Sequence, residues 1–444
     1  MNFLCARLAV LVLSLSTSLA QAQSDQTLWT ELLQLRQEMQ QLKNELQQLQ
    51  AERRTAMSTA PAMSAGGHTE TALETAPLAQ GVDAVPTLES ESRVHLFGYG
   101  ELAYTRPLRN TAQTLATARR GVLGFAYRFN ERTRFAAELE IENAVVSAGD
   151  QGEAAFEQLY VEHDLSGDLS VKAGLFLLPL GYLNESHEPT RYYGVSRNQV
   201  ETAIIPTTWR ELGVGLQGRT EQGWRWNTGV VTSFDLNKWP TSSDGRSDTQ
   251  ASPLATIHQE GQLARAASMA YYGVVNYDGH PGVNVGGGLF QGGINQKQPD
   301  TQALMKGAQI TLYELHSKWQ YQRWELSALG ALGQFSGVAD FNASGIANPV
   351  PHVFKGGYAQ VAYRAWQQGD YSWVPFARYE RLNTAVGYAG LTPSTMPTHT
   401  PDTRTWTAGM SFYLHPQVVL KMDAQHFLNN HQLDRVNLGV GFHY

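Results

Sequence analysis

The side chains best suited to chemistry lie on a predicted hairpin, residues 119–143 (RRGVLGFAYRFNERTRFAAELEIEN). Guanidinium and carboxylate groups recur there at alternate positions, namely Arg120, Arg128, Arg134, Glu138, Glu140 and Glu142. Positions between them are apolar, among them Leu123, Phe125 and Leu139. A period of two indicates β-strands with one charged and one apolar face. Such charges can act on a passing ion, and we expect the arginines to line one side of a pore and the glutamates another, giving a transverse field.

A second group of charges lies in the segment from Leu178 to Arg210, which is predicted to be the third and longest of the long connections between strands. Its ionisable side chains are Glu185, His187, Glu188, Arg191, Arg197, Glu201 and Arg210. In large barrels a long ordered loop can fold inward and narrow the bore. We therefore expect a constriction here, and the alternative is an external loop exposed to the medium.

These charges need a frame, and alternating segments supply one throughout residues 93–444. The predicted strands are residues 94–104, 119–129, 132–142, 154–164, 169–177, 211–219, 224–234, 267–277, 282–292, 309–320, 324–335, 356–366, 371–382, 404–414, 417–427 and 435–444. Their connections alternate between short turns and long loops, as in outer-membrane barrels. The pattern predicts an all-β fold, a 16-stranded antiparallel transmembrane β-barrel. A barrel of this size should hold a water-filled channel lined by polar side chains.

Aromatic residues near the short turns are a second sign of a membrane barrel, because they gather at the interfaces of a bilayer. They are Phe129, Trp224, Trp226, Tyr277, Trp319, Trp324, Trp373 and Tyr413. Against this trend, strict alternation puts Trp366 on the inner face. The chain ends in VNLGVGFHY, an alternating strand with an aromatic last residue, similar to the assembly signal of bacterial outer-membrane proteins.

The N-terminal region predicts export and self-association. Residues 1–22 have the pattern of a signal peptide with a small-residue cleavage site, and they contain the only cysteine, Cys5. Residues 25–54 predict a parallel α-helical coiled coil with acidic and basic flanking positions. Its seam consists of Leu28, Leu32, Leu35, Met39, Leu42, Leu46 and Leu49. A single amphipathic helix on another surface is the alternative, and the seam does not choose between dimer and trimer. Residues 55–92, rich in Ala, Thr, Ser, Gly and Pro, predict a disordered linker.

Other kinds of chemistry find little support in the sequence. Residues 93–444 contain 28 Lys and Arg against 30 Asp and Glu, so no basic excess favours nucleic acid. Gly213, Gly215 and Gly218 match a dinucleotide-binding motif by letters, but they lie in a strand that leads to a short turn. His187 and Glu188 are adjacent, and no nearby His or Cys completes a metal site. We therefore expect no enzyme activity, no cofactor and no metal.

Five segments resemble the phosphate-selective porin O and P family and its trimeric relatives that carry an N-terminal periplasmic coiled coil. They are FGYGELAY (97–104), VKAGLFLLPLGYLNESHEP (171–189), RNQVETAIIPTTWRELGVGLQG (197–218), PFARYERLNT (375–384) and HPQVVLKMDAQ (415–425). The resemblance implies a homotrimer in the outer-membrane lipid of a Gram-negative bacterium, with the coil in the periplasm. It also implies passive diffusion of small hydrophilic solutes, with phosphate and carboxylate anions as candidates. The alternative function is a cell-envelope tether that is anchored by the barrel and acts through its coil.

Overall fold

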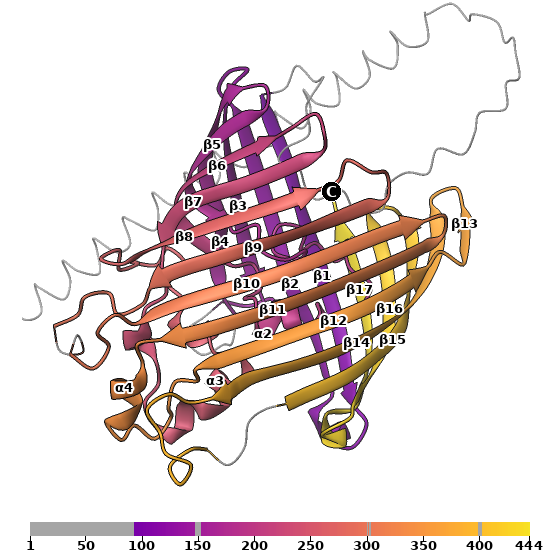
Figure 1. Cartoon of the computed structure of the whole chain (residues 1–444). Coiled ribbons are helices and arrows are strands. Elements are labelled where there is room, and N and C mark those ends of the chain that lie inside the picture. Colours follow the sequence, from indigo (N-terminus) through magenta and orange to yellow (C-terminus); the bar gives the residue numbers. More distant parts are fainter. Residues whose placement is uncertain (1–92, 147–151, 300, 302, 398–401) are drawn as a thin grey trace, which may run out of the picture. The chain divides into compact units, whose positions relative to one another are not determined.

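The strands form one closed antiparallel sheet, in which β1 (Val94–Pro107) pairs with both β2 (Leu115–Arg128) and β17 (Arg435–His443) (Figure 1). The structure is a computed structural model and describes residues 93–146, 152–299, 301, 303–397 and 402–444. The predicted signal peptide, coiled coil and linker lie outside the described residues. None of the described helices is long and apolar enough to cross a membrane.

The remaining strands follow one another around the sheet in chain order. They are β3 (Thr133–Glu142), β4 (Ala154–Ser166), β5 (Leu169–Leu177), β6 (Arg210–Arg219), β7 (Trp224–Thr232), β8 (Met269–Tyr277), β9 (Val283–Gly293), β10 (Gln309–Tyr321), β11 (Trp324–Ser336), β12 (Val353–Tyr363), β13 (Trp366–Gln368), β14 (Tyr371–Gly387), β15 (Asp402–His415) and β16 (Val418–Phe427). All strand pairings are antiparallel. Apart from the closing β1–β17 pair and the β12–β14 pair, each pairing joins strands that are neighbours in the sequence.

The three-residue strand β13 continues β12, because both pair with β14. Counted in this way the barrel has sixteen strands, which confirms the predicted architecture. Ala362 pairs with Phe376, whereas Trp366 pairs with Trp373, so the break shifts the register by one residue. Directly paired residues share a face of the sheet, and Trp366 and Trp373 are 41% and 40% exposed. The prediction that Trp366 lies on the inner face is therefore wrong.

Alternation on β2 and β3 matches the pattern expected for a membrane wall. Leu123 and Leu139 are 53% and 39% exposed, whereas Glu138 and Glu140 on the opposite face are 9% and 6% exposed. In an isolated soluble sheet the carboxylates would face water and the leucines would be covered. Here the exposed face is the apolar one, which suits lipid, and the charges face the interior.

Short and long connections lie at opposite ends of the strands, as predicted, and the helices lie in the long ones. These are η1 (Thr111–Gln113), α2 (Val200–Ala203), η2 (Leu236–Lys238), η3 (Ser243–Gly245), α3 (Arg246–Ala251), η4 (Ala255–Ile257), α4 (Ala339–Ala343) and η5 (His431–Leu433). The prediction that the third long connection is the longest is wrong. Because β7 ends at Thr232 and β6 begins at Arg210, the fourth loop (233–268) is longer than the third (178–209).

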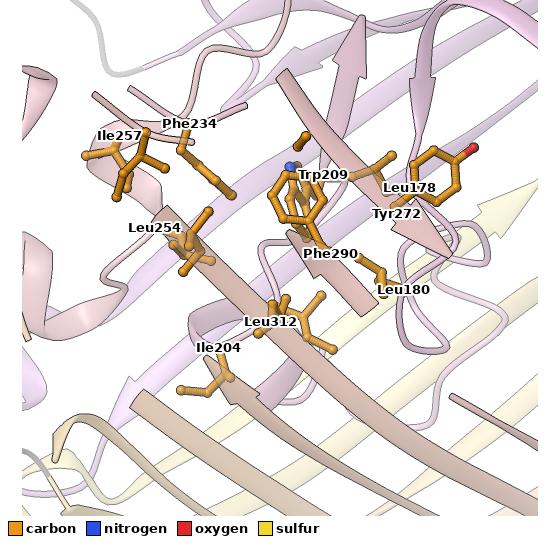
Figure 2. Packing of buried hydrophobic residues seen from close by; sticks show 14 of the residues in the cluster. Leu178, Leu180, Ile204, Trp209, Phe234, Leu254, Ile257, Tyr272, Phe290 and Leu312 are labelled. Atoms are coloured by element: carbon orange, nitrogen blue, oxygen red, sulfur yellow. The ribbon is translucent and has the colours of Figure 1, made fainter. Parts of the chain in front are cut away.

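A dry core fills part of the barrel at the long-loop end (Figure 2). Inward-facing Phe290, Leu312 and Phe354 are fully buried, and loop residues such as Trp209 and Phe234 pack against them. Trp209 lies 4.5 Å from Phe290 and 5.2 Å from Phe234 between ring centroids. The expectation of polar side chains all round the bore is wrong here, because several long loops fold onto this wall and bury apolar side chains against it.

Candidate functional site

The third loop (178–209) lies inside the barrel. Its backbone is hydrogen-bonded by inward-facing side chains of strands far along the sheet from β5 and β6, which it connects. The carboxylates of Glu380 and Asp423 accept from the backbone N–H groups of Gln199 and Val195, both at 2.6 Å. The Ser411 hydroxyl and the Lys421 ammonium donate to the carbonyl oxygens of Tyr193 and Gly194, both at 2.9 Å. The loop therefore crosses from the β5–β6 wall to the β14–β16 wall, and the alternative of an external loop is wrong.

Glu201 holds the two arms of the loop together. Its Oε1 accepts hydrogen bonds from the backbone N–H groups of Tyr182 (2.5 Å) and Leu183 (2.8 Å). Its Oε2 accepts from Asn198 Nδ2 (2.6 Å) and from the Tyr358 hydroxyl on β12 (3.0 Å). Glycine is required at Gly181, whose φ is +76°, because a Cβ there would lie 2.6 Å from Glu201 Oε1.

The other ionisable residues of the loop occupy distinct places. His187 and Arg197 are buried against β4 and the loop itself, and Arg197 donates to Thr207 and to the carbonyl of His187. Glu185 lines a cavity at the short-turn end. The carbonyl of Glu188 accepts from the backbone N–H of Arg191 (2.9 Å).

Arg210 does not belong to the inner group. It is the first residue of β6 and shares the outer face with Leu212 and Val214. Loop residue Glu260 covers it there, with 3.4 Å between Arg210 Nη2 and the carboxylate. The assignment of Arg210 to the constriction is therefore corrected: the side chain points away from the lumen, as the alternation of β6 requires.

Charges on the wall are interleaved rather than separated by sign. Arg120 lies 3.4 Å from Glu101, 3.7 Å from Glu140 and 3.5 Å from Glu142. A bulge in the β1–β2 pairing at Arg119 turns both consecutive arginines inward, and Arg119 also pairs with Glu101 (2.9 Å). The expected division into an arginine side and a glutamate side is not found at Arg120.

The same interleaving holds nearer the short turns, where Arg134 pairs with Glu162 (2.5 Å) and Asp164 (3.1 Å). Arg128 faces the interior on the same strand as Arg120 and forms no ion pair with any residue that the structure describes.

Sequence reasoning missed several inward charges, including Glu101, Glu157, Glu162 and Lys421. Alternation along β1 and β16 would have identified Glu101 and Lys421 as inward positions. Glu157 could not be found in this way, because a bulge in the β3–β4 pairing places an extra residue between Phe156 and Gln158. A pure period of two assigns Glu157 to the lipid face.

A cavity of about 810 Å³ opens at the short-turn end beneath the loop, and we refer to it as the vestibule. Its basic side chains are Arg128, Arg132, Arg134, Lys172, Arg219 and Arg225, and its acidic ones are Glu131, Asp164, Asp168 and Glu185. The Lys172 ammonium lies over the ring of Tyr160, 4.7 Å from its centroid. Basic groups therefore outnumber acidic ones around this cavity.

The surroundings of His187 change its proton affinity. Burial opposes its charged form, but the Glu157 carboxylate, 3.5 Å from His187 Nε2, outweighs burial and raises the pKa of His187 to about 9. Nothing in this region pairs a nucleophile with a base and a substrate cavity. The arrangement is one of fixed charges around a passage.

Comparison with known proteins agrees with this reading. Residues 92–432 match the family described as phosphate-selective porin O and P. An uncharacterised protein of Aquifex aeolicus (strain VF5) is 28% identical over 354 residues, covering 77% of this chain and 78% of that protein. OmpF of Salmonella typhi, solved in complex with daunomycin, has the same fold, with a TM-score of 0.54 and 11% identity over 79% of this chain and 97% of that chain. Because the family match spans most of the barrel, the chain belongs to the phosphate-selective porin O and P family and is an outer-membrane porin, a channel and not an enzyme.

Proposed function

We propose that this porin passes small hydrophilic anions by passive diffusion and that the third loop sets the narrowest point of the path. The loop supports this role because it begins and ends at the β5–β6 wall and is hydrogen-bonded across the lumen to the β14–β16 wall. It also occupies space that a sixteen-strand barrel would otherwise leave to water.

The vestibule carries the proposal of anion preference. Arg128 and Arg132 line it and form no ion pair with the residues described in the structure, whereas Arg134, Arg219 and Arg225 are matched by carboxylates. Two guanidinium groups that form no ion pair among the described residues raise the local concentration of anions at this mouth and lower that of cations.

Reversal potentials across a planar bilayer under a KCl gradient test the proposal. A unit charge about 7 Å from an ion in water contributes about 0.6 kcal/mol, or about threefold in local ion concentration, before screening. The variant Arg128→Ala/Arg132→Ala should therefore lower the chloride-to-potassium permeability ratio several-fold at low salt, and the effect should fade near 1 M salt.

The matched control is Arg109→Ala/Arg381→Ala, which removes the same charge from exposed positions, one in a long connection and one on the outer face of β14. It should leave the ratio unchanged. Cation preference in the unmodified porin, or equal ratios in the vestibule variant and the control, would refute the proposal.

We further propose that the porin is a homotrimer whose coiled coil, residues 25–54, lies in the periplasm. The heptad seam and its charged flanks support self-association of this segment.

A further inference from the structure

Three side chains that commonly bind metal ions converge inside the barrel from separate segments. Glu138 comes from β3, Glu157 from the bulge of β4, and His187 from the third loop. One ligand atom of each lies within 4.8 Å of the corresponding atoms of the other two. All three residues are buried, with 9%, 0% and 4% exposure.

The imidazole of His187 is oriented for coordination. Its Nδ1 lies 2.9 Å from the carbonyl oxygen of Asn184, which can only accept, so Nδ1 carries a proton and donates. Nε2 is thereby directed at the carboxylates, 3.5 Å from Glu157 Oε2. Metal-bound histidines are usually held in this way, with the second ring nitrogen bonded to a carbonyl or a carboxylate. The ring of Tyr99 packs edge-on against the imidazole, with 5.3 Å between centroids.

One oxygen of each carboxylate lacks a hydrogen-bond partner, although Glu157 Oε2 accepts from the Tyr99 hydroxyl (3.4 Å) and lies 3.5 Å from His187 Nε2. Glu138 Oε2 and Glu157 Oε1 are buried and accept no hydrogen bond. Nearby guanidinium groups are used elsewhere, since Arg120 pairs with Glu101, Glu140 and Glu142. Among the described residues, Glu138 has no arginine or lysine within ion-pair distance. Buried carboxylate oxygens without donors are costly, and a bound cation removes that cost.

We propose that Glu138, Glu157 and His187 bind a divalent first-row transition-metal ion, such as Zn²⁺, which joins the third loop to the β3–β4 wall. A donor set of one imidazole and two carboxylates suits such an ion, and three protein ligands leave a position for water. Ligands about 2.1 Å from a tetrahedral ion lie about 3.4 Å apart, close to the 3.5 Å between His187 Nε2 and Glu157 Oε2. Glu138 closes the remaining gap by rotation of its side chain.

Zinc binding to the full-length porin, folded in detergent and stripped with a chelator, tests the proposal by titration calorimetry. The expected result is one high-affinity site per chain. Glu138→Gln and His187→Asn should each weaken it at least tenfold while the barrel keeps its heat-modifiable migration on a gel.

The matched control removes a different group of potential ligands. His426, His431 and Asp434 cluster at the surface, and both histidines lie within 3.5 Å of the aspartate. The variant His426→Asn/His431→Asn should keep the high-affinity site. Loss of that site in this variant, or an unchanged site in Glu138→Gln and His187→Asn, would overturn the proposal.

Anomalous diffraction from zinc-soaked crystals provides a measurement that does not depend on any variant folding. A peak between the two carboxylates and the imidazole is expected. The absence of an anomalous peak at this position would show that His187 serves instead as a protonated partner of Glu157, and it would refute the proposed metal site.

Discussion

Replacement of Glu201 by alanine should release the third loop from its inward position. The carboxylate accepts hydrogen bonds from Tyr182 N, Leu183 N, Asn198 Nδ2 and the Tyr358 hydroxyl, and the residue is 2% exposed. Hydrogen bonds to a charged group contribute about 1.5–3 kcal/mol each, but bonds within one network do not add fully.

Breaking a buried charged network by removing one member typically costs about 3–5 kcal/mol. At about 1.4 kcal/mol per tenfold, the ratio of closed to open loop should fall by about two to three and a half orders of magnitude. Glu201→Gln keeps the shape but presents an amide N–H₂ to donors on one side, so its effect should be about half as large.

Single-channel recordings and limited proteolysis measure the release. Glu201→Ala should show a larger and noisier conductance and new cleavage within residues 178–209, with Glu201→Gln intermediate. The control is Glu221→Ala, an exposed carboxylate in the short turn between β6 and β7, which should behave as the unmodified protein. Unchanged conductance and protease resistance in Glu201→Ala would show that the loop is held by something other than this carboxylate.

Three further results are expected. Trp209→Ala should lower the stability of the folded barrel by about 3–5 kcal/mol, seen as a lower temperature of the heat-modifiability transition. Trp224→Ala on the outer face should cost much less, and equal losses in the two variants would contradict the dry core. The hydrogen bond from His258 and the charge of Arg210 lower the pKa of Glu260. The stabilising contribution of Glu260 is therefore complete above its ordinary pKa and is lost as pH falls through the lowered pKa. Proteolysis of the fourth loop should rise only in that acidic range, and a rise near neutral pH would contradict this prediction. Deletion of Thr27–Arg54 should leave single-channel conductance intact and weaken the oligomer on a native gel, and loss of conductance would contradict a self-sufficient barrel.

Most of the wall could be predicted from sequence because its cause is local. Successive side chains of a strand point to opposite faces, so a lipid-facing wall appears in the sequence as alternation. Strand β3 and the part of β2 after Arg119 follow this alternation. The same rule would have placed Arg210 on the outer face if the predicted strand 211–219 had been extended by one residue toward the N-terminus. The coiled coil and the solute preference stay predictions.

Places where a neighbour decides the geometry could not be predicted in this way. The bulges at Arg119 and Glu157 and the break before Trp366 arise from how two strands pair, and each one changes which face a side chain occupies. The dry core likewise depends on long loops finding apolar inward positions on strands distant in sequence.

By itself the sequence determined an exported chain with a sixteen-strand wall, oil-facing on one side and charged on the other, since alternation requires only the geometry of a single strand. Only the tertiary structure decided that the third loop enters the lumen, that Arg120 sits among carboxylates, and that Glu138, Glu157 and His187 meet. Those outcomes depend on contacts between residues far apart in the chain, and the closure of the barrel brings them together.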